Sequence, residues 1–309
     1  MKRMRAVDAN RVFLISVVFS QAMIFLVTGA GVRDRMVLQI LMQMFLAAPA
    51  VAYLFMQRVS IKEGLAVHAI GWVEWLLLLP LAICINHIAG VINVLSQLFT
   101  VNTISNSMAE LVMKYPFPFA FFTIAVVPAF CEESLFRGVL YRGYRKCGTW
   151  VAILLTAFLF GVMHMNPNQF FYAFALGIVF ALVNEITGSC LPSFFLHMYI
   201  NGSSVMNLFL TVRDNEEALQ ESITIDAAAI SEYLTESLPW TVAAVAGMFV
   251  VLFLLIRCKG SERKRMTPLF GKEEIEPKEE RGGFGVVCSP ALLTGVIICV
   301  WYMILRTGS

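Results

Sequence analysis

Charged residues are scarce in this sequence of 309 residues. Lys, Arg, Asp and Glu make up 14% of it and hydrophobic residues 59%, whereas about 25% of the residues in a soluble domain are charged. This shortage excludes an ordinary soluble domain and indicates a chain built for lipid. The formal net charge is +2. Basic clusters beside the apolar runs account for it, so nucleic acid is not expected as a partner.

Several motifs that would indicate other classes of protein are also missing. The seven cysteines are odd in number and scattered, without a CxxC pair, and so show no disulfide framework. Cys131 adjoins two glutamates, but we expect it to be a small apolar core residue rather than a nucleophile. We find no glycine-rich phosphate-binding motif and no internal repeat. The HExxH spacing of zinc proteases is absent too, so no local motif requires a metal.

Long uncharged apolar runs are abundant. Most of them reach the ~17–25 residues that cross a bilayer as a helix, in which the backbone satisfies its own hydrogen bonds. They predict an all-α fold, a polytopic transmembrane helical bundle of about nine helices, with eight as the alternative. The first run is too long for a cleaved signal peptide. The runs are 12–32, 36–56, 75–99, 115–131, 149–166, 169–184, 190–212, 238–256 and 284–305.

Basic residues mark alternate loops and predict the orientation of the bundle. We expect a multi-pass protein of the cell (cytoplasmic) membrane, with its N-terminus in the cytoplasm. The acidic stretch 213–239 then falls outside, although Arg33 and Arg35 depart from the pattern on that side. The mixed-charge stretch 257–283 reads as a solvated cytoplasmic loop. The basic clusters are Lys2, Arg3, Arg5 and Arg11; Arg58 and Lys62; Arg142, Arg145 and Lys146; and Arg257, Lys259, Arg263, Lys264 and Arg265.

Three charged residues interrupt the otherwise apolar helix of residues 115–141. Glu133 and Arg137 are four residues apart, the favourable order for an ion pair on one helix face. Glu132 points ~100° away from Glu133 on the helix, so we expect it to be a free carboxylate that faces neighbouring helices. Pro128 lacks a backbone N–H and is expected to kink the helix just before the acids. The sequence therefore predicts one structural pair and one reactive group.

Three more polar residues lie on two later apolar helices. His164 follows one run, and His197 and Asn201 share a helix face at i, i+4 spacing. Each of them alone is as well explained by a hydrogen bond between helices, but ionisable groups gathered inside a membrane indicate a functional site. With Glu132 they would suit hydrolysis, in which the carboxylate takes a proton from water and the others orient the water or donate to an oxyanion. Zinc held by Glu132, His164 and His197 is the alternative.

The motifs EESLFRG, FGVMH and HMYIN, with TGS at 187–189, occur in the order of EExxxR, FxxxH and HxxxN. In this order they resemble the CPBP family of CAAX-processing and bacteriocin-processing intramembrane proteases, also called Abi or lysostaphin-resistance-protein-A-like. The resemblance implies peptide-bond hydrolysis, with Glu132 and His164 activating water and His197 and Asn201 stabilising the oxyanion. The family is commonly labelled metalloprotease, although a metal-free glutamate mechanism is also argued for it. Zinc is thus an open cofactor that the spacing does not require.

The resemblance divides the chain into three segments. Residues 1–114 hold N-terminal transmembrane helices, 115–212 the protease-like core, and 213–309 the acidic external loop and the C-terminal helices. The expected partners are membrane lipid and a peptide or membrane-protein substrate, lipidated or not. Two other interpretations stay open, a non-catalytic membrane scaffold or bacteriocin-immunity protein, and a proton-coupled transporter. Inverted repeats typical of many transporters are not evident.

Overall fold

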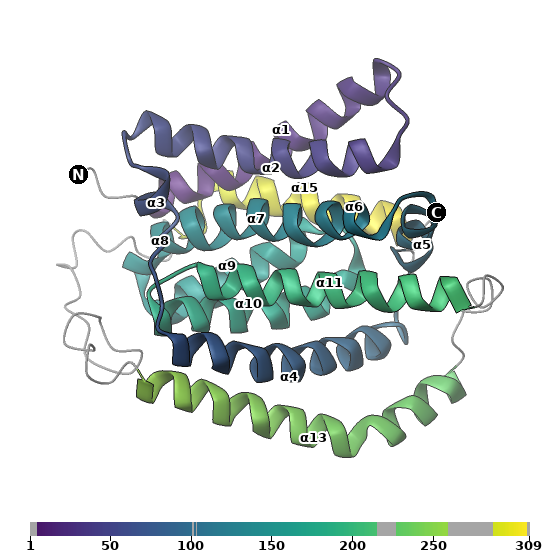
Figure 1. The fold of residues 1–309 in the computed structure, drawn as a ribbon. Coiled ribbons are helices and arrows are strands. Elements are labelled where there is room, and N and C mark those ends of the chain that lie inside the picture. The colour runs from purple at the N-terminus through teal and green to yellow at the C-terminus, as the bar shows by residue number, and fades with distance from the viewer. Residues whose placement is uncertain (1–4, 101, 103, 215–226, 259–286, 308–309) are drawn as a thin grey trace.

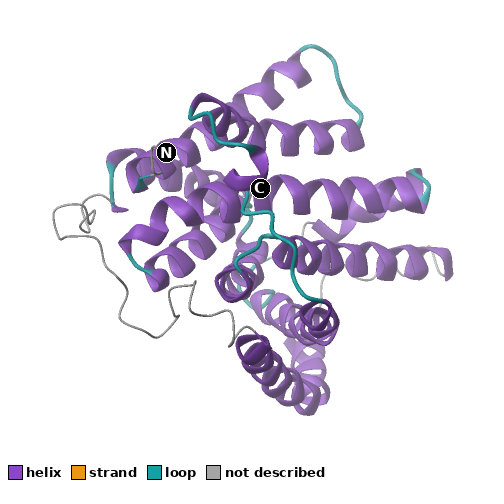
Figure 2. Ribbon diagram, turned by 60° about the vertical axis from the view of Figure 1, so that its left-hand side comes forward, coloured by secondary structure: helices purple, strands orange, loops and turns teal. Residues whose placement is uncertain are grey.

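The fold is a bundle of helices. The computed structural model describes residues 5–100, 102, 104–214, 227–258 and 287–307, and within these ranges the chain forms helices and no strand (Figures 1 and 2). This confirms the all-α class. Residues 215–226 of the acidic loop and 259–286 of the mixed-charge loop lie outside the described residues.

A helix is present at each of the nine apolar runs. Six helical stretches are both long and apolar enough to cross a membrane, while α9 and α15 are shorter apolar helices. The helices outside the central one are α1 (Ala6–Gly29), α2 (Arg35–Met56), α3 (Ile61–Gly64), α4 (Trp72–Ser96), α5 (Ile104–Lys114), α9 (Thr149–Met163), α10 (Pro167–Thr187), α11 (Leu191–Asp214), α13 (Ala227–Cys258) and α15 (Pro290–Thr307).

The central helix is continuous from Phe117 to Cys147, beyond the end of the fourth apolar run at residue 131. It consists of α6 (Phe117–Phe121), the π-helical η1 (Phe122–Val126), α7 (Val127–Glu133), the π-helical η2 (Ser134–Leu140), α8 (Tyr141–Tyr144) and the 3₁₀ turn η3 (Arg145–Cys147). In the most apolar part of this helix 67% of the residues are buried, against 56% in α10 and a smaller share in the other four long spans. This helix is therefore the one most enclosed by the rest of the bundle.

Helix also forms in two segments that the sequence did not assign to a helix. The segment before the central helix holds α5, on which Ala109 and Val112 are buried, because its apolar residues recur at helical spacing. The acidic stretch 213–239 ends in the first turns of α13, which begins at Ala227. Its Ala, Leu and Glu residues are good helix formers despite their low hydropathy. Pro239 lies within α13, and the helix is bent in Figure 1.

The remaining helices surround the central one in an order that places the polar residues inside. α11 packs on η1 and α7, α2 on α7, and α9 on α8, while α10 lies between α9, α11 and α4. α13 covers α4, and α15 contacts α1 and α9. The N-terminal helices thus contact the segment that carries both glutamates, so the site has walls from outside the stretch that carries the three motifs.

Candidate active site

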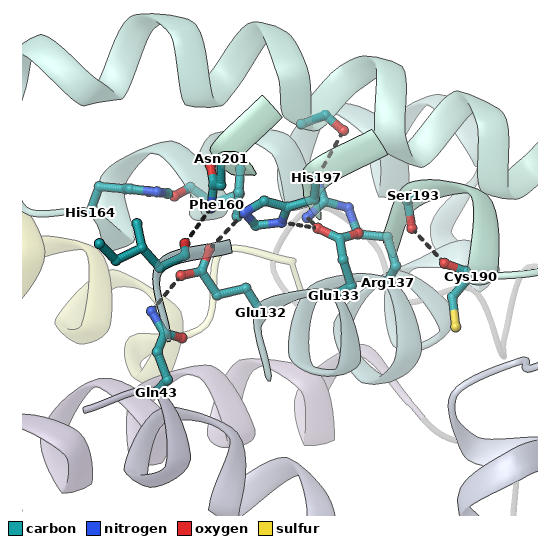
Figure 3. Close-up of polar contacts among 12 residues, drawn as sticks. Gln43, Glu132, Glu133, Arg137, Phe160, His164, Cys190, Ser193, His197 and Asn201 are labelled. Carbon is teal, nitrogen blue, oxygen red and sulfur yellow. Dashed lines mark hydrogen bonds and ion pairs between the residues drawn. The ribbon is translucent and has the colours of Figure 1, made fainter. Parts of the chain in front are cut away.

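The six residues singled out in the sequence come from four neighbouring helical segments (Figure 3). Glu132 and Glu133 end α7, Arg137 lies in η2, His164 follows the last residue of α9, and the other two are on α11. The wide turns of η1 and η2 lie on either side of α7. π-helical turns are rare and often mark functional positions. The structure thus brings together residues that are up to 69 positions apart in the chain, from Glu132 to Asn201.

The predicted ion pair is present and fully enclosed. Arg137 Nη1 donates to Glu133 Oε1 at 2.9 Å, and the two residues are 1% and 2% exposed. Arg137 Nη2 also donates to the Gly177 carbonyl at 3.2 Å. The guanidinium carbon lies 4.5 Å from the centre of the Phe160 ring, within the range of a cation–π contact. These contacts compensate the arginine in part for its loss of water, while its Nε is buried without a hydrogen-bond partner among the described residues.

Glu133 has a second role that the sequence did not predict. Its Oε1 also contacts His197 Nδ1 at 3.0 Å. Because a carboxylate paired with Arg137 is an acceptor, Nδ1 must carry the hydrogen, which leaves Nε2 of the neutral ring as an acceptor. The Phe160 and Phe180 rings pack against the imidazole, at 5.7 and 5.6 Å between centroids. Glu133 therefore sets both the tautomer and the direction of His197.

Glu132 is not free, contrary to the expectation from sequence. Its Oε1 accepts a hydrogen bond from Gln43 Nε2 on α2 at 2.8 Å. Its other oxygen, Oε2, is buried without a hydrogen-bond partner among the described residues. That oxygen lies 3.9 Å from His197 Nε2. One oxygen is thus held by an amide, and the other faces an imidazole beyond direct hydrogen-bonding distance.

Gln43 is a site residue that sequence reasoning missed. It is buried, and it lies outside the stretch that carries the three motifs. A signal was available, since Gln39 and Gln43 are four residues apart in the apolar run 36–56 and so share one helix face. Nothing in that spacing tells which helix the face meets.

His164 is held at the turn between α9 and α10. Its Nδ1 donates to the Phe160 carbonyl one turn earlier, at 2.7 Å. The donation leaves Nε2 as the acceptor of the neutral ring. Met165 follows with φ of +50°, a left-handed conformation that reverses the chain before Pro167 begins α10. Phe160 lies edge-on to both histidines, with a centroid separation of 4.9 Å to His164.

Asn201 donates to the Ile124 carbonyl at 3.3 Å. In a regular α-helix that carbonyl would accept the N–H of residue 128, and Pro128 has none. Asn201 thus supplies a donor where the proline removes one, which joins α11 to the π-turn before the two glutamates. The sequence predicted a kink at Pro128, and the structure places the π-helical η1 directly before it. One of the two amide hydrogens of Asn201 is committed to this bond.

A cavity of about 1020 Å³ joins these groups. Glu132, His164, His197 and Asn201 line it, whereas Glu133 and Arg137 lie behind its wall. Beyond them the lining is rich in uncharged amides. These amides are Gln21, Gln39, Gln43, Asn86, Asn93, Asn102, Asn166, Asn168, Gln169 and Asn207.

Zinc binding would require three ligand side chains that converge on one point. Among the described residues, no group of three or more His, Cys, Asp and Glu side chains is arranged to hold a metal ion. Glu132, His164 and His197, the three candidate ligands, therefore do not fit zinc as they are placed. His197 is further constrained, because its Nδ1 is bound to Glu133.

The comparison with protein families agrees with the three motifs. A family model described as type II CAAX prenyl endopeptidase, Rce1-like, matches residues 114–203, which include all three motifs. The match supports membership of the CPBP family. The family supports an intramembrane endopeptidase in general, acting on a peptide or protein substrate in a membrane. Comparisons with curated proteins and with solved structures gave no match.

The buried pair generates a prediction about stability. Replacing Glu133 by Gln leaves Arg137 charged and unpaired, which should cost about 3–5 kcal/mol, and Arg137→Gln should be similarly destabilising. The double variant should recover part of the loss, because contacting residues are coupled. Melting temperatures of the purified variants in nanodiscs measure this.

A surface pair provides the control for that comparison. Arg35 and Glu110 are each 58% exposed in their side chains, and exposed ion pairs contribute about 0–1 kcal/mol. Arg35→Gln should therefore leave the melting temperature almost unchanged. Additive losses at Glu133 and Arg137, or an equal loss at Arg35, would show that the buried pair does not stabilise the bundle as described.

Proposed function

We propose that the protein is an endopeptidase that hydrolyses peptide bonds within the membrane, with Glu132 as the general base for water. The observation that carries this proposal is the unequal environment of the two adjacent carboxylates. Each carboxylate has one buried oxygen without a hydrogen-bond partner among the described residues. Glu133, however, is held through Oε1 by Arg137 and His197 behind the cavity wall, whereas Glu132 lines the cavity. A carboxylate that is anchored on one side and open on the other suits proton transfer.

The chemical step requires few groups. A water molecule beside Glu132 Oε2 gives up a proton to it, and the water oxygen attacks the carbonyl carbon of the substrate. The 3.9 Å between Glu132 Oε2 and His197 Nε2 is a distance that an intervening oxygen atom bridges with two hydrogen bonds. Glu132 then passes the proton to the leaving nitrogen, and the products are a carboxylate and an amine.

The other polar groups stabilise charge and position in this proposal. The amide of Asn201 and a protonated His197 donate to the developing oxyanion, while Nε2 of His164 accepts from the water. Glu133 and Arg137 do not touch substrate. Glu133 positions His197, and Arg137 keeps Glu133 in place. The apolar rings around Arg137 restrict water behind the cavity wall, which strengthens the electrostatic interactions in front of it.

The proposed substrate is a membrane-associated protein or peptide. The family description supports a CAAX-type endopeptidase, and a prenylated or otherwise lipidated segment is the finer proposal. The non-catalytic scaffold or immunity protein remains the rival that the tests below must distinguish.

The first test replaces the proposed base. Glu132→Gln preserves the shape and the hydrogen bond to Gln43 but removes the proton acceptor, so turnover should fall by about 10²–10⁴-fold. The melting temperature should stay near that of the wild type. Turnover is measured in nanodiscs, on a substrate found by comparing membrane-protein termini in cells with the wild type or the variant.

Two outcomes would contradict the assignment of Glu132. Identical membrane-protein termini in both kinds of cell would favour the scaffold. A stable but inactive Glu133→Gln variant, beside an active Glu132→Gln variant, would show that the two carboxylates have been assigned the wrong way round.

The second test concerns Gln43. Gln43→Leu removes the amide that holds Glu132 Oε1, so the base should be misdirected and kcat should fall by up to about 100-fold. Gln39→Leu is the matched control, since Gln39 lies one turn earlier on the same helix and lines the same cavity without contacting Glu132. The control should change KM at most. Equal kcat losses in both variants would show that the hydrogen bond to Glu132 does not position it.

The third test concerns zinc. Because the candidate ligands do not converge and the i+4 partner of His197 is an amide, we expect weak or absent dependence on tightly bound zinc. Turnover should survive incubation with a strong chelator, and elemental analysis of the purified protein should find zinc well below one atom per chain. Stoichiometric zinc, with activity lost on chelation and restored by metal, would overturn this prediction.

A further inference from the structure

The two ends of the bundle differ in charge. At one end, called here the basic end, α1 starts and α3 and α8 lie (Figure 1). At the other, the acidic end, α5 lies and α15 finishes. α11 ends and α13 begins at the acidic end. The sequence from 213 to 239, which includes the end of α11 and the start of α13, has seven acids and one arginine. The described cations of the basic end are Arg5, Arg11, Arg58, Lys62, Arg142, Arg145, Lys146 and Arg257.

Two cations of the acidic end form ion pairs, among them Arg35, one of the two arginines that depart from the charge pattern in the sequence. Arg35 forms an ion pair with Glu110 on α5, and Lys114 pairs with Asp34 at 2.9 Å. Hydrogen bonds from Tyr115 and Lys114 lower the pKa of the Asp34 carboxyl, which keeps it charged. The positive-inside rule counts lysines and arginines, and the described residues include more of them at the basic end than at the acidic end, so the basic end is assigned to the cytoplasm.

The cavity extends from the middle of the bundle to the acidic end and does not reach the described residues of the basic end. Its lining begins near the middle of the bundle, at Leu46, Glu132 and His197, and follows α11 outward. Ser204, Asn207 and Thr211 line it on the last turns of α11, and all three are exposed. No described residue of α3, α8 or η3, which lie at the basic end, lines the cavity.

The lining also restricts the chemistry of what enters. Glu132 is the one carboxylate along it, and no lysine or arginine of the described residues joins it. The amide and hydroxyl side chains offer both donors and acceptors, which match the N–H and C=O groups of an extended peptide backbone. An acidic side chain would meet Glu132 without a cation to compensate it, so the lining favours neutral or basic segments.

We propose that the site is reached from the non-cytoplasmic side of the membrane, by an extended, non-acidic polypeptide segment that enters along α11 at the acidic end. The statement that this segment is a substrate rests on the proposed function. The direction of access does not depend on catalysis. It can therefore be tested in a protein that cleaves nothing.

The experiment measures cysteine labelling from one side of the membrane. Asn207→Cys places a thiol at the cavity mouth, and a membrane-impermeant maleimide is added to spheroplasts or to permeabilised membranes. The wild type is the matched control, because its exposed Cys258 lies at the opposite end. We expect Asn207→Cys to be labelled in intact spheroplasts at least 10-fold more than the wild type, and Cys258 to react only after permeabilisation.

A second variant and a second measurement allow the test to be completed even if Asn207→Cys folds poorly. Thr211→Cys, one turn further out on α11, should show the same sidedness if Asn207→Cys folds poorly. Labelling of either thiol from outside should also block turnover of the reporter substrate, since a bulky adduct then occupies the entrance. Labelling of the mouth only after permeabilisation overturns the proposal, and so does full turnover by fully labelled protein. A Glu132→Gln variant with unchanged cleavage would instead refute the proposed function, and the sidedness would stand.

Discussion

The buried ion pair between Glu133 and Arg137 is the interaction on which the rest of the site depends. A charged side chain is tolerated away from water only when an opposite charge and hydrogen bonds compensate for its lost hydration. Arg137 bonds to Gly177 on α10 and lies over Phe160 on α9, and Glu133 bonds to His197 on α11. Four segments therefore meet at one pair of charges, and the direction of the His197 ring follows from that meeting.

The two adjacent glutamates differ because of helix geometry. Neighbouring residues on a helix point ~100° apart, so Glu133 faces α10 and α11 while Glu132 faces α2 and the cavity. Asn201 bonds to the carbonyl that loses its α-helical donor to Pro128. A proline, an asparagine and a π-turn thus form one structural unit beside the base, and the same residue that is expected to bind an oxyanion also stabilises the helix.

The sequence predicted those parts of the fold that depend on hydropathy averaged over one helix length. Runs of about 20 apolar residues predicted the nine helices, because hydropathy over one helix length is enough to identify a span. The same measure failed for α5 and for the first turns of α13, which are helical but polar. The fourth uncharged run likewise ends at residue 131, before Glu132, whereas the helix continues to Cys147.

Hydropathy and spacing along one helix were enough to predict the membrane-helical class, the Glu133–Arg137 pair and the shared face of His197 and Asn201. Which helix faces meet depends on the packing of the bundle. The contact of Gln43 with Glu132, of His197 with Glu133, and of Asn201 with Ile124 each joins two helices. Their rotation and relative depth come from the packing of the whole bundle, and no spacing within one helix contains that information.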